Sequence, residues 1–121
     1  MKSIIALLAS ALLAFSAQAA NGPIDGIYSC TVSAAGTIVQ PYISISGRPD
    51  GQSLWVVAAV YPSTSFYGYG IGTVSGNKFT GSTMFLMPFD FTITGTTLSG
   101  TVTALSNGRS IVGSVVCNLI W

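Results

Sequence analysis

The chain contains no histidine and no glutamate, and only 6% of its 121 residues are charged. Histidine is the commonest general acid–base in enzymes and the commonest metal ligand, so its absence removes the usual machinery of hydrolases and metalloenzymes. The carboxylates are limited to Asp25 at a strand start, Asp50 in a Pro-Asp-Gly turn and Asp90 on a polar strand face. No serine or threonine has an evident activating base. We therefore expect no catalysis, no metal and no cofactor.

Charge of either sign is scarce. After residue 19, Arg48, Lys78 and Arg109 balance the three aspartates, so the net charge is close to zero. Such a chain lacks the basic footprint that nucleic acids or anionic membranes attract, and we expect no nucleic-acid binding. Weak self-repulsion also favours association, which makes a homo-oligomer one reading of the composition.

The first residues read as an export signal. Lys2 precedes an apolar run over 4–15, and Ala17-Gln18-Ala19 has the small-residue pattern of a cleavage site. The run is too short for a stable membrane span. The sequence predicts a bacterial signal peptide over 1–19, a single domain over 20–121, and a periplasmic or extracellular location.

The two cysteines are Cys30 and Cys117. In an exported chain, two cysteines predict one disulfide bond between them. A disulfide requires its Cα atoms to lie within about 7 Å, so the first and last strands of the domain must meet.

The mature chain shows no helical stripe, and Gly, Ser and Thr separate short apolar runs. Asn107-Gly108 is a strong hairpin signal. Pro41 indicates an edge or a bulge in the second strand. We predict eight strands, over 26–33, 37–46, 53–61, 66–74, 78–87, 89–94, 97–104 and 110–121.

An internal repeat favours a meander. The stretch 73–83 matches 92–102, with glycine aligned on glycine and apolar positions aligned on apolar positions. A repeated hairpin predicts that each strand pairs with the next. Closing the sheet would pair the backbone groups of its two edge strands with each other. It would also bring the first and last strands close enough for the Cys30–Cys117 disulfide. The predicted fold is therefore all-β, an eight-stranded antiparallel up-and-down barrel, with a two-sheet β-sandwich as the alternative.

Two segments, Asn77-Lys78-Phe79-Thr80-Gly81-Ser82-Thr83 and Phe89-Asp90-Phe91-Thr92, resemble hairpins of avidin-like and lipocalin-like meander barrels. The resemblance covers about a fifth of the chain and implies a barrel fold. It carries no ligand, because the polar contact set of the avidins has no counterpart at these positions.

The C-terminus suggests a further alternative. Trp121 follows alternating apolar positions, Val115, Cys117 and Leu119, as in the closing strand of small outer-membrane barrels. Those barrels have a polar interior, long outer loops and aromatic girdles. The sequence shows none of these features, and we do not expect membrane insertion.

The candidate site is a strand with aromatic side chains on one face and glycines on the other. Alternation places Tyr67 and Tyr69 on one face of the segment 66–72, and its glycines on the other. Tyrosine and tryptophan combine apolar area with a polar handle, and glycines allow close approach of a ring. The expected ligand or partner surface comprises Trp55, Tyr61, Tyr67, Tyr69, Gly68, Gly70 and Gly72.

The segment 54–61 is apolar on both faces, so its outer face is either covered or adhesive. These features predict a small non-catalytic binding protein. Its partner would be a small apolar ligand or another protein, as in a protease inhibitor. The competing prediction is a structural module that self-assembles in the envelope or outside the cell. Which faces of the third and fourth strands point inward is left open, since one bulge would exchange them.

Overall fold

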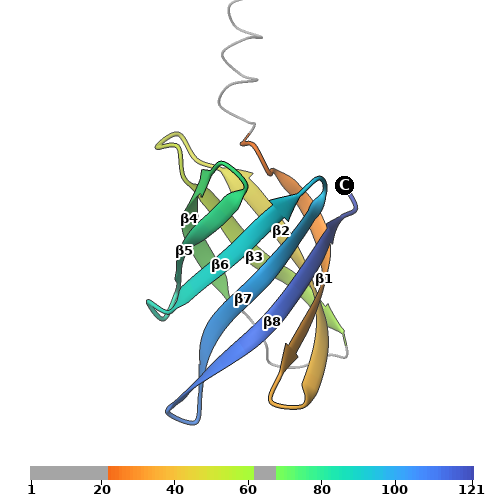
Figure 1. Cartoon of the computed structure of the whole chain (residues 1–121), viewed down its shortest axis with the longest axis vertical. Helices are drawn as coiled ribbons and strands as arrows, with labels where there is room; N and C mark the ends of the chain where they lie inside the picture. The colour runs from red at the N-terminus through yellow and green to blue at the C-terminus, as the bar shows by residue number, and fades with distance from the viewer. Residues whose placement is uncertain (1–21, 62–67) are drawn as a thin grey trace, which may run out of the picture.

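The chain folds into a closed antiparallel barrel in which each strand pairs with the next and the last pairs with the first (Figure 1). The computed structural model describes residues 22–61 and 68–121. The eight strands are β1 (Gly26–Ala34), β2 (Thr37–Gly47), β3 (Ser53–Tyr61), β4 (Tyr69–Ser75), β5 (Lys78–Thr83), β6 (Pro88–Thr94), β7 (Thr97–Ser106) and β8 (Arg109–Leu119).

The predicted barrel is confirmed, and the sandwich alternative is not adopted. Strand β1 pairs with β8 along the seam, and Cys30 lies directly opposite Cys117 in that ladder. The two cysteines form a disulfide with their Cα atoms 4.0 Å apart. The bond therefore crosses the seam that closes the sheet, as expected from the cysteine positions, and it is consistent with an oxidising environment.

Alternation along the strands separates a mostly apolar interior from the outer wall. Inward positions of β5–β7, such as Phe79, Phe91 and Leu98, are buried, while the outward positions are Thr, Ser, Lys or Asp apart from Pro88 and Leu105. The rings of Phe79, Phe89 and Phe91 pack with centroids 4.9 to 6.1 Å apart. The buried core comprises Ile24, Tyr28, Cys30, Val32, Ile43, Ile45, Trp55, Phe79, Phe89, Phe91, Leu98, Val115 and Cys117.

The sequence repeat corresponds to two equivalent hairpins, β4–β5 and β6–β7. Their turns contain Gly76 and Gly95 with φ of 58° and 59°. The next aligned pair, Gly81 and Gly100, lies where a neighbouring strand comes so close that a Cβ would collide with a backbone carbonyl oxygen. The glycines of the repeat therefore mark the same turn and the same bend of the wall in both hairpins.

Pro41 lies inside a continuous β2 and not at an edge. The irregularity that proline predicted is one residue later, where the register with β3 shifts between Tyr42 and Ile43. The shift leaves Ala58 of β3 as the extra residue of a bulge. Before the bulge Trp55 and Val57 face inward, and after it Ala59 faces outward opposite Tyr42.

The fifth strand is shorter than predicted. It ends at Thr83, and residues 84–87 form the turn to β6. The Leu86 N–H donates to the Thr83 carbonyl at 2.9 Å, and the Thr83 N–H donates to the Met87 carbonyl at 2.8 Å. The predicted strand over 78–87 would place Phe85 on the same face as Phe79, whereas Phe85 is about half exposed in this turn. The prediction was wrong because an apolar run reads as strand by pattern, whereas backbone hydrogen bonds define the turn.

One end of the barrel is sealed by the chain before β1. We call it the closed end, and it holds the β2–β3, β4–β5 and β6–β7 turns (top of Figure 1). The buried Tyr28 hydroxyl donates to the Ile24 carbonyl at 2.9 Å. The Gly47 N–H donates to Asp25 Oδ1 at 2.6 Å. These two bonds hold the N-terminal segment across the barrel.

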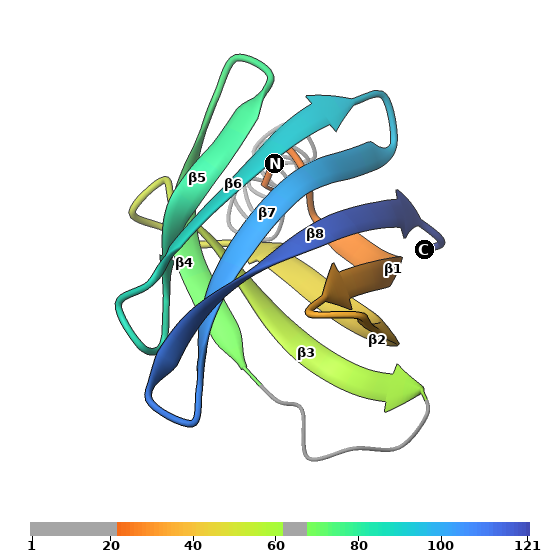
Figure 2. The ribbon, with the colours of Figure 1, turned by 60° about the horizontal axis from the view of Figure 1, so that its bottom comes forward.

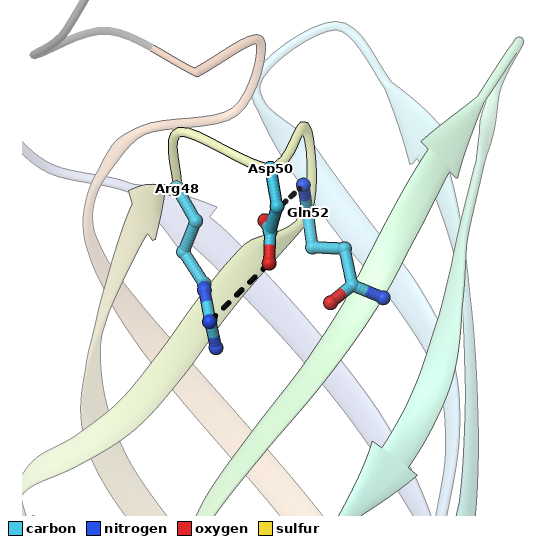
Figure 3. Close-up of polar contacts among 3 residues, drawn as sticks. All are labelled: Arg48, Asp50 and Gln52. Carbon is cyan, nitrogen blue, oxygen red and sulfur yellow. Dashed lines mark hydrogen bonds and ion pairs between the residues drawn. The ribbon is translucent and has the colours of Figure 1, made fainter.

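The β2–β3 turn at the closed end is stabilised by its own polar side chains (Figure 3). The Asp50 carboxylate lies 3.2 Å from the Arg48 guanidinium and accepts the Gln52 N–H at 3.0 Å. The exposed ion pair contributes little on its own, but the aspartate-to-backbone bond fixes a turn that the Pro-Asp-Gly sequence already favours.

Candidate functional site

The opposite end of the barrel opens into a cavity. We call this the open end, and it holds the β1–β2, β5–β6 and β7–β8 turns (Figure 2). The cavity has a volume of about 100 Å³. Its wall comes from strands on all sides of the barrel, because inward side chains there are small or aliphatic. They include Val32, Ala34, Val57, Val102, Ala104, Ile111 and Gly113.

A smaller chamber of about 40 Å³ lies deeper in the barrel, against the disulfide. Val32, Trp55, Val57 and Val102 line both spaces, so the two are neighbours that share a wall. The chamber is otherwise bounded by Cys30, Pro41, Ile43, Phe91, Val115 and Cys117. The barrel axis is therefore packed at the closed end and hollow toward the open end.

Trp55 forms the boundary between packed core and cavity. Its ring meets Phe89 nearly at right angles, with centroids 5.7 Å apart. The indole Nε1 is buried and has no hydrogen-bond partner in the part of the chain that the structure describes. Because Nε1 is itself sealed, the cavity meets the carbon atoms of the ring. The site thus offers an apolar aromatic surface to whatever enters.

The glycines explain how the indole fits. Gly70 lies opposite Trp55 in the β3–β4 ladder, and a Cβ at Gly70 would collide with the indole ring. A Cβ at Gly72 would meet the backbone of Thr80 and the ring of Phe89. The bare strip predicted from sequence therefore faces inward and accommodates aromatic rings of the protein's own core.

The predicted surface is divided between the two sides of the wall. Trp55 and Gly68 line the cavity, and Tyr69 contributes to its rim while remaining exposed. Gly70 and Gly72 lie deeper, beneath the rings. Tyr61 is the last residue of β3, opposite Gln40, and Tyr67 lies outside the described residues. Trp55 and Tyr69 do not form one face, because strand alternation points them to opposite sides.

An apolar patch covers the outer wall of β2–β4. Tyr69 pairs with Val56, and Tyr42 pairs with Ala59 across the bulge. All four are exposed. Of the two alternatives left open for the outer face of β3, the structure has the exposed one.

Several lining residues were absent from the predicted site. Ala34, Ala104 and Gly113 lie on inward rows near the open end, and their small size creates the space. The sequence signal was present in two strands, since the inward row of β1 passes from Tyr28 to Ala34 and that of β7 from Leu98 to Ala104. It could be read only after the barrel had set the inward parity of each strand.

The described residues hold no cluster of three or more His, Cys, Asp or Glu side chains. They also include no helix long and apolar enough to cross a bilayer. Burial, with a smaller contribution from Asp25, raises the pKa of Tyr28 above its usual value. Tyr28 lies at the closed end, away from the cavity. Its raised pKa therefore reflects its burial under the N-terminal segment and is not a feature of the cavity.

No protein-family model matches this chain, and no curated protein or solved structure matches it.

Proposed function

We propose that the protein is a non-catalytic binding protein that holds a small apolar molecule in the open end of its barrel. The observation that carries the proposal is the apolar cavity bounded by Trp55. Apolar cavities lined by a few convergent side chains are the usual form of small-ligand sites. The polar outer wall of β5–β7 supports a barrel that works in water.

The volume limits the ligand. An engineered cavity of about 150 Å³ lined by Leu, Ile and Phe stays dry and binds benzene. The main cavity here is about 100 Å³, with the 40 Å³ chamber beside it. A single ring or a short branched alkyl group matches this space. A long acyl chain could place only its end there.

The test uses Trp55 as the reporter. The chain has two tryptophans, so the Trp121→Phe variant leaves Trp55 alone at the cavity. Toluene titrated into this variant should change its fluorescence saturably and raise the unfolding temperature, as mass action requires for a ligand of the folded state. Native mass spectrometry of protein isolated from cells would identify a co-purifying ligand.

Two matched substitutions localise the site. Ala104→Leu fills the cavity from β7, whereas Ala59→Leu makes the same change on the exposed outer wall. We expect Ala104→Leu to weaken toluene binding about tenfold or more and Ala59→Leu to leave it unchanged. Equal weakening by both, or a wild type without saturable binding, would contradict the proposal.

The outer patch on β2–β4 favours a second candidate, self-assembly as a structural module. Exposed Tyr42, Val56 and Tyr69 would be buried between copies. The native mass spectrum that reports a ligand also reports oligomers. Ligand-free oligomers would favour this candidate over the binding protein.

A further inference from the structure

The β5–β6 turn at the open end is built only from apolar side chains. Its residues are Met84, Phe85, Leu86 and Met87. Turns ordinarily use Gly, Pro, Asn, Asp or Ser, because these residues suit the backbone and face water. Leu86 is 87% exposed and Phe85 is 48% exposed. The turn is nevertheless well defined, with backbone hydrogen bonds from Leu86 and Thr83 closing it.

Leu86 also occupies an unfavourable backbone conformation. Its φ is 59°, in the left-handed region that a branched side chain rarely adopts. Two turns at the closed end have nearly the same angle, and both place glycine there, Gly76 and Gly95. A residue that is both conformationally unsuited and exposed stabilises neither the turn nor the core. Its apolar side chain therefore points to a contact outside the barrel.

More exposed apolar residues surround the turn. Leu105 of β7 and Val112 of β8 lie beside the neighbouring hairpin tip, and both face outward. Met84 and Phe85 line the same cavity as Ala104 and Ile111, so the two turns border one mouth. Figure 2 shows them at the same end of the barrel. We define Phe85, Leu86, Leu105 and Val112 as the mouth rim.

Charge at this end is positive. The sequence of the three turns with their flanking residues, 34–38, 83–88 and 104–112, contains Arg109 and no carboxylate. The closed end carries Asp25 and two ion pairs, Arg48 with Asp50 and Lys78 with Asp90. A net charge near zero thus conceals an uneven distribution. The chain as a whole has no basic footprint, so any attraction to anionic lipid is local to this end, where an apolar rim adjoins one cation and no anion in the three stretches named above. That combination matches the interface of an anionic bilayer, where apolar tips enter the headgroup boundary and cations are attracted.

We propose that the mouth rim docks on the surface of an anionic lipid bilayer, with the cavity mouth facing the lipid. The barrel stays outside the membrane, and Phe85 and Leu86 reach the headgroup–acyl boundary. The contact stands on the rim itself and does not depend on whether the cavity takes a ligand. It differs from the membrane-spanning barrel considered from sequence, since β5 and β6 direct mostly Lys, Thr, Ser and Asp outward.

Vesicle flotation tests the contact with the full-length mature protein. The probes are phosphatidylcholine vesicles with and without one quarter phosphatidylglycerol. We expect wild-type protein to float with the mixed vesicles and about fivefold less with phosphatidylcholine alone. Arg109→Gln should remove most of that difference, because one cation near an anionic surface accounts for a factor of this size.

A matched pair of double variants separates the two ends. Phe85→Ser with Leu86→Asn removes the rim tip, and asparagine tolerates the left-handed conformation at 86. Ile120→Ser with Trp121→Asn removes side chains that are 55% and 87% exposed at the closed end. We expect the first pair to lower vesicle partitioning about tenfold or more and the second to leave it unchanged.

Three results would overturn the proposal. They are a wild type that stays unbound with both vesicle types, loss of flotation in the closed-end variant, and retained flotation in the rim variant. Urea unfolding of each variant serves as the folding control. The rim variant should be at least as stable as wild type, so that lost flotation cannot come from lost structure.

Discussion

The two ends of the barrel differ in how their interiors are filled. Toward the closed end, the rings of Phe79, Phe89 and Phe91 interlock, and the bonds of Tyr28 and Asp25 hold the N-terminal segment across the opening. Toward the open end, the same inward rows carry alanine, glycine and valine, and a cavity remains. One wall of eight strands thus supports a packed half and a hollow half.

The turns differ in the same direction. At the closed end, the residues with positive φ in the three turns are Gly51, Gly76 and Gly95. At the open end, positive φ also occurs at Ala35, Leu86 and Asn107. Asparagine suits this conformation, whereas alanine and leucine do not. Residues that are unsuited to a left-handed backbone conformation are therefore found in the turns at the open end.

The difference indicates a division of labour. Native proteins depart from ideal packing and turn chemistry mostly where function requires it, and other regions compensate in stability. In this barrel the disulfide and the aromatic cluster supply that stability. The open end is then free to keep space, exposed apolar groups and unfavourable backbone angles.

The largest expected effect is in the packed half. Phe79 is 0% exposed, so Phe79→Ala should lower the free energy of unfolding by about 3–5 kcal/mol. Val102 borders both cavities, so its side chain has fewer packed neighbours to lose. Val102→Ala should therefore lower the free energy of unfolding by only about 1 kcal/mol. Urea denaturation of both variants measures the difference. Equal losses would mean that the open half is packed as tightly as the closed half.

The seal of the closed end should give a smaller effect that depends on pH. At neutral pH, Tyr28→Phe loses the hydroxyl bond to the Ile24 carbonyl and should cost about 1 kcal/mol. The pKa of Tyr28 is raised by burial and by Asp25, so the unfolded chain loses this proton first as the pH rises. The stability that Tyr28 contributes to the wild type is therefore full below about pH 10 and declines as the pH rises above it.

The variant has no proton to lose at this position. The stability difference between wild type and Tyr28→Phe should therefore be constant below about pH 10 and narrow as the pH rises above it, as followed by urea midpoints. The remaining tyrosines are common to both proteins and cancel in the comparison. A difference that stays constant as the pH rises further would show that Tyr28 titrates alike in both states.

Much of the fold could be predicted from sequence, because its causes are local or covalent. The alternation of Phe89, Asp90 and Phe91 identifies a strand, and Asn107-Gly108 identifies a two-residue turn with positive φ at both positions. The repeated hairpin indicated the meander. The predicted pairing of Cys30 with Cys117 then supplied the one long-range constraint, which brings the first and last strands together and closes the sheet.

The site could be predicted only in part, because it depends on parity and on tertiary hydrogen bonds. The residue types around Trp55 and Gly70 were found, but their joint inward orientation required the β3–β4 register. The segment 84–87 was read as strand, since an apolar run carries no signal for a turn. The exposure of Phe85 and Leu86 could therefore not be predicted from the hydrophobic pattern. It became evident only from the backbone hydrogen bonds of the β5–β6 turn.

The smallest expected effects compare the same backbone angle at the two ends. Leu86→Gly relieves a left-handed conformation with little loss of packing, because the side chain is exposed, and should raise stability by up to about 1 kcal/mol. Gly76→Ala places a side chain at φ 58° in open space and should lower stability by about 1 kcal/mol. Urea midpoints of the two variants should move in opposite directions. If Leu86→Gly instead lowers stability, the leucine has a stabilising role within the barrel, and its exposure would no longer require a contact outside it.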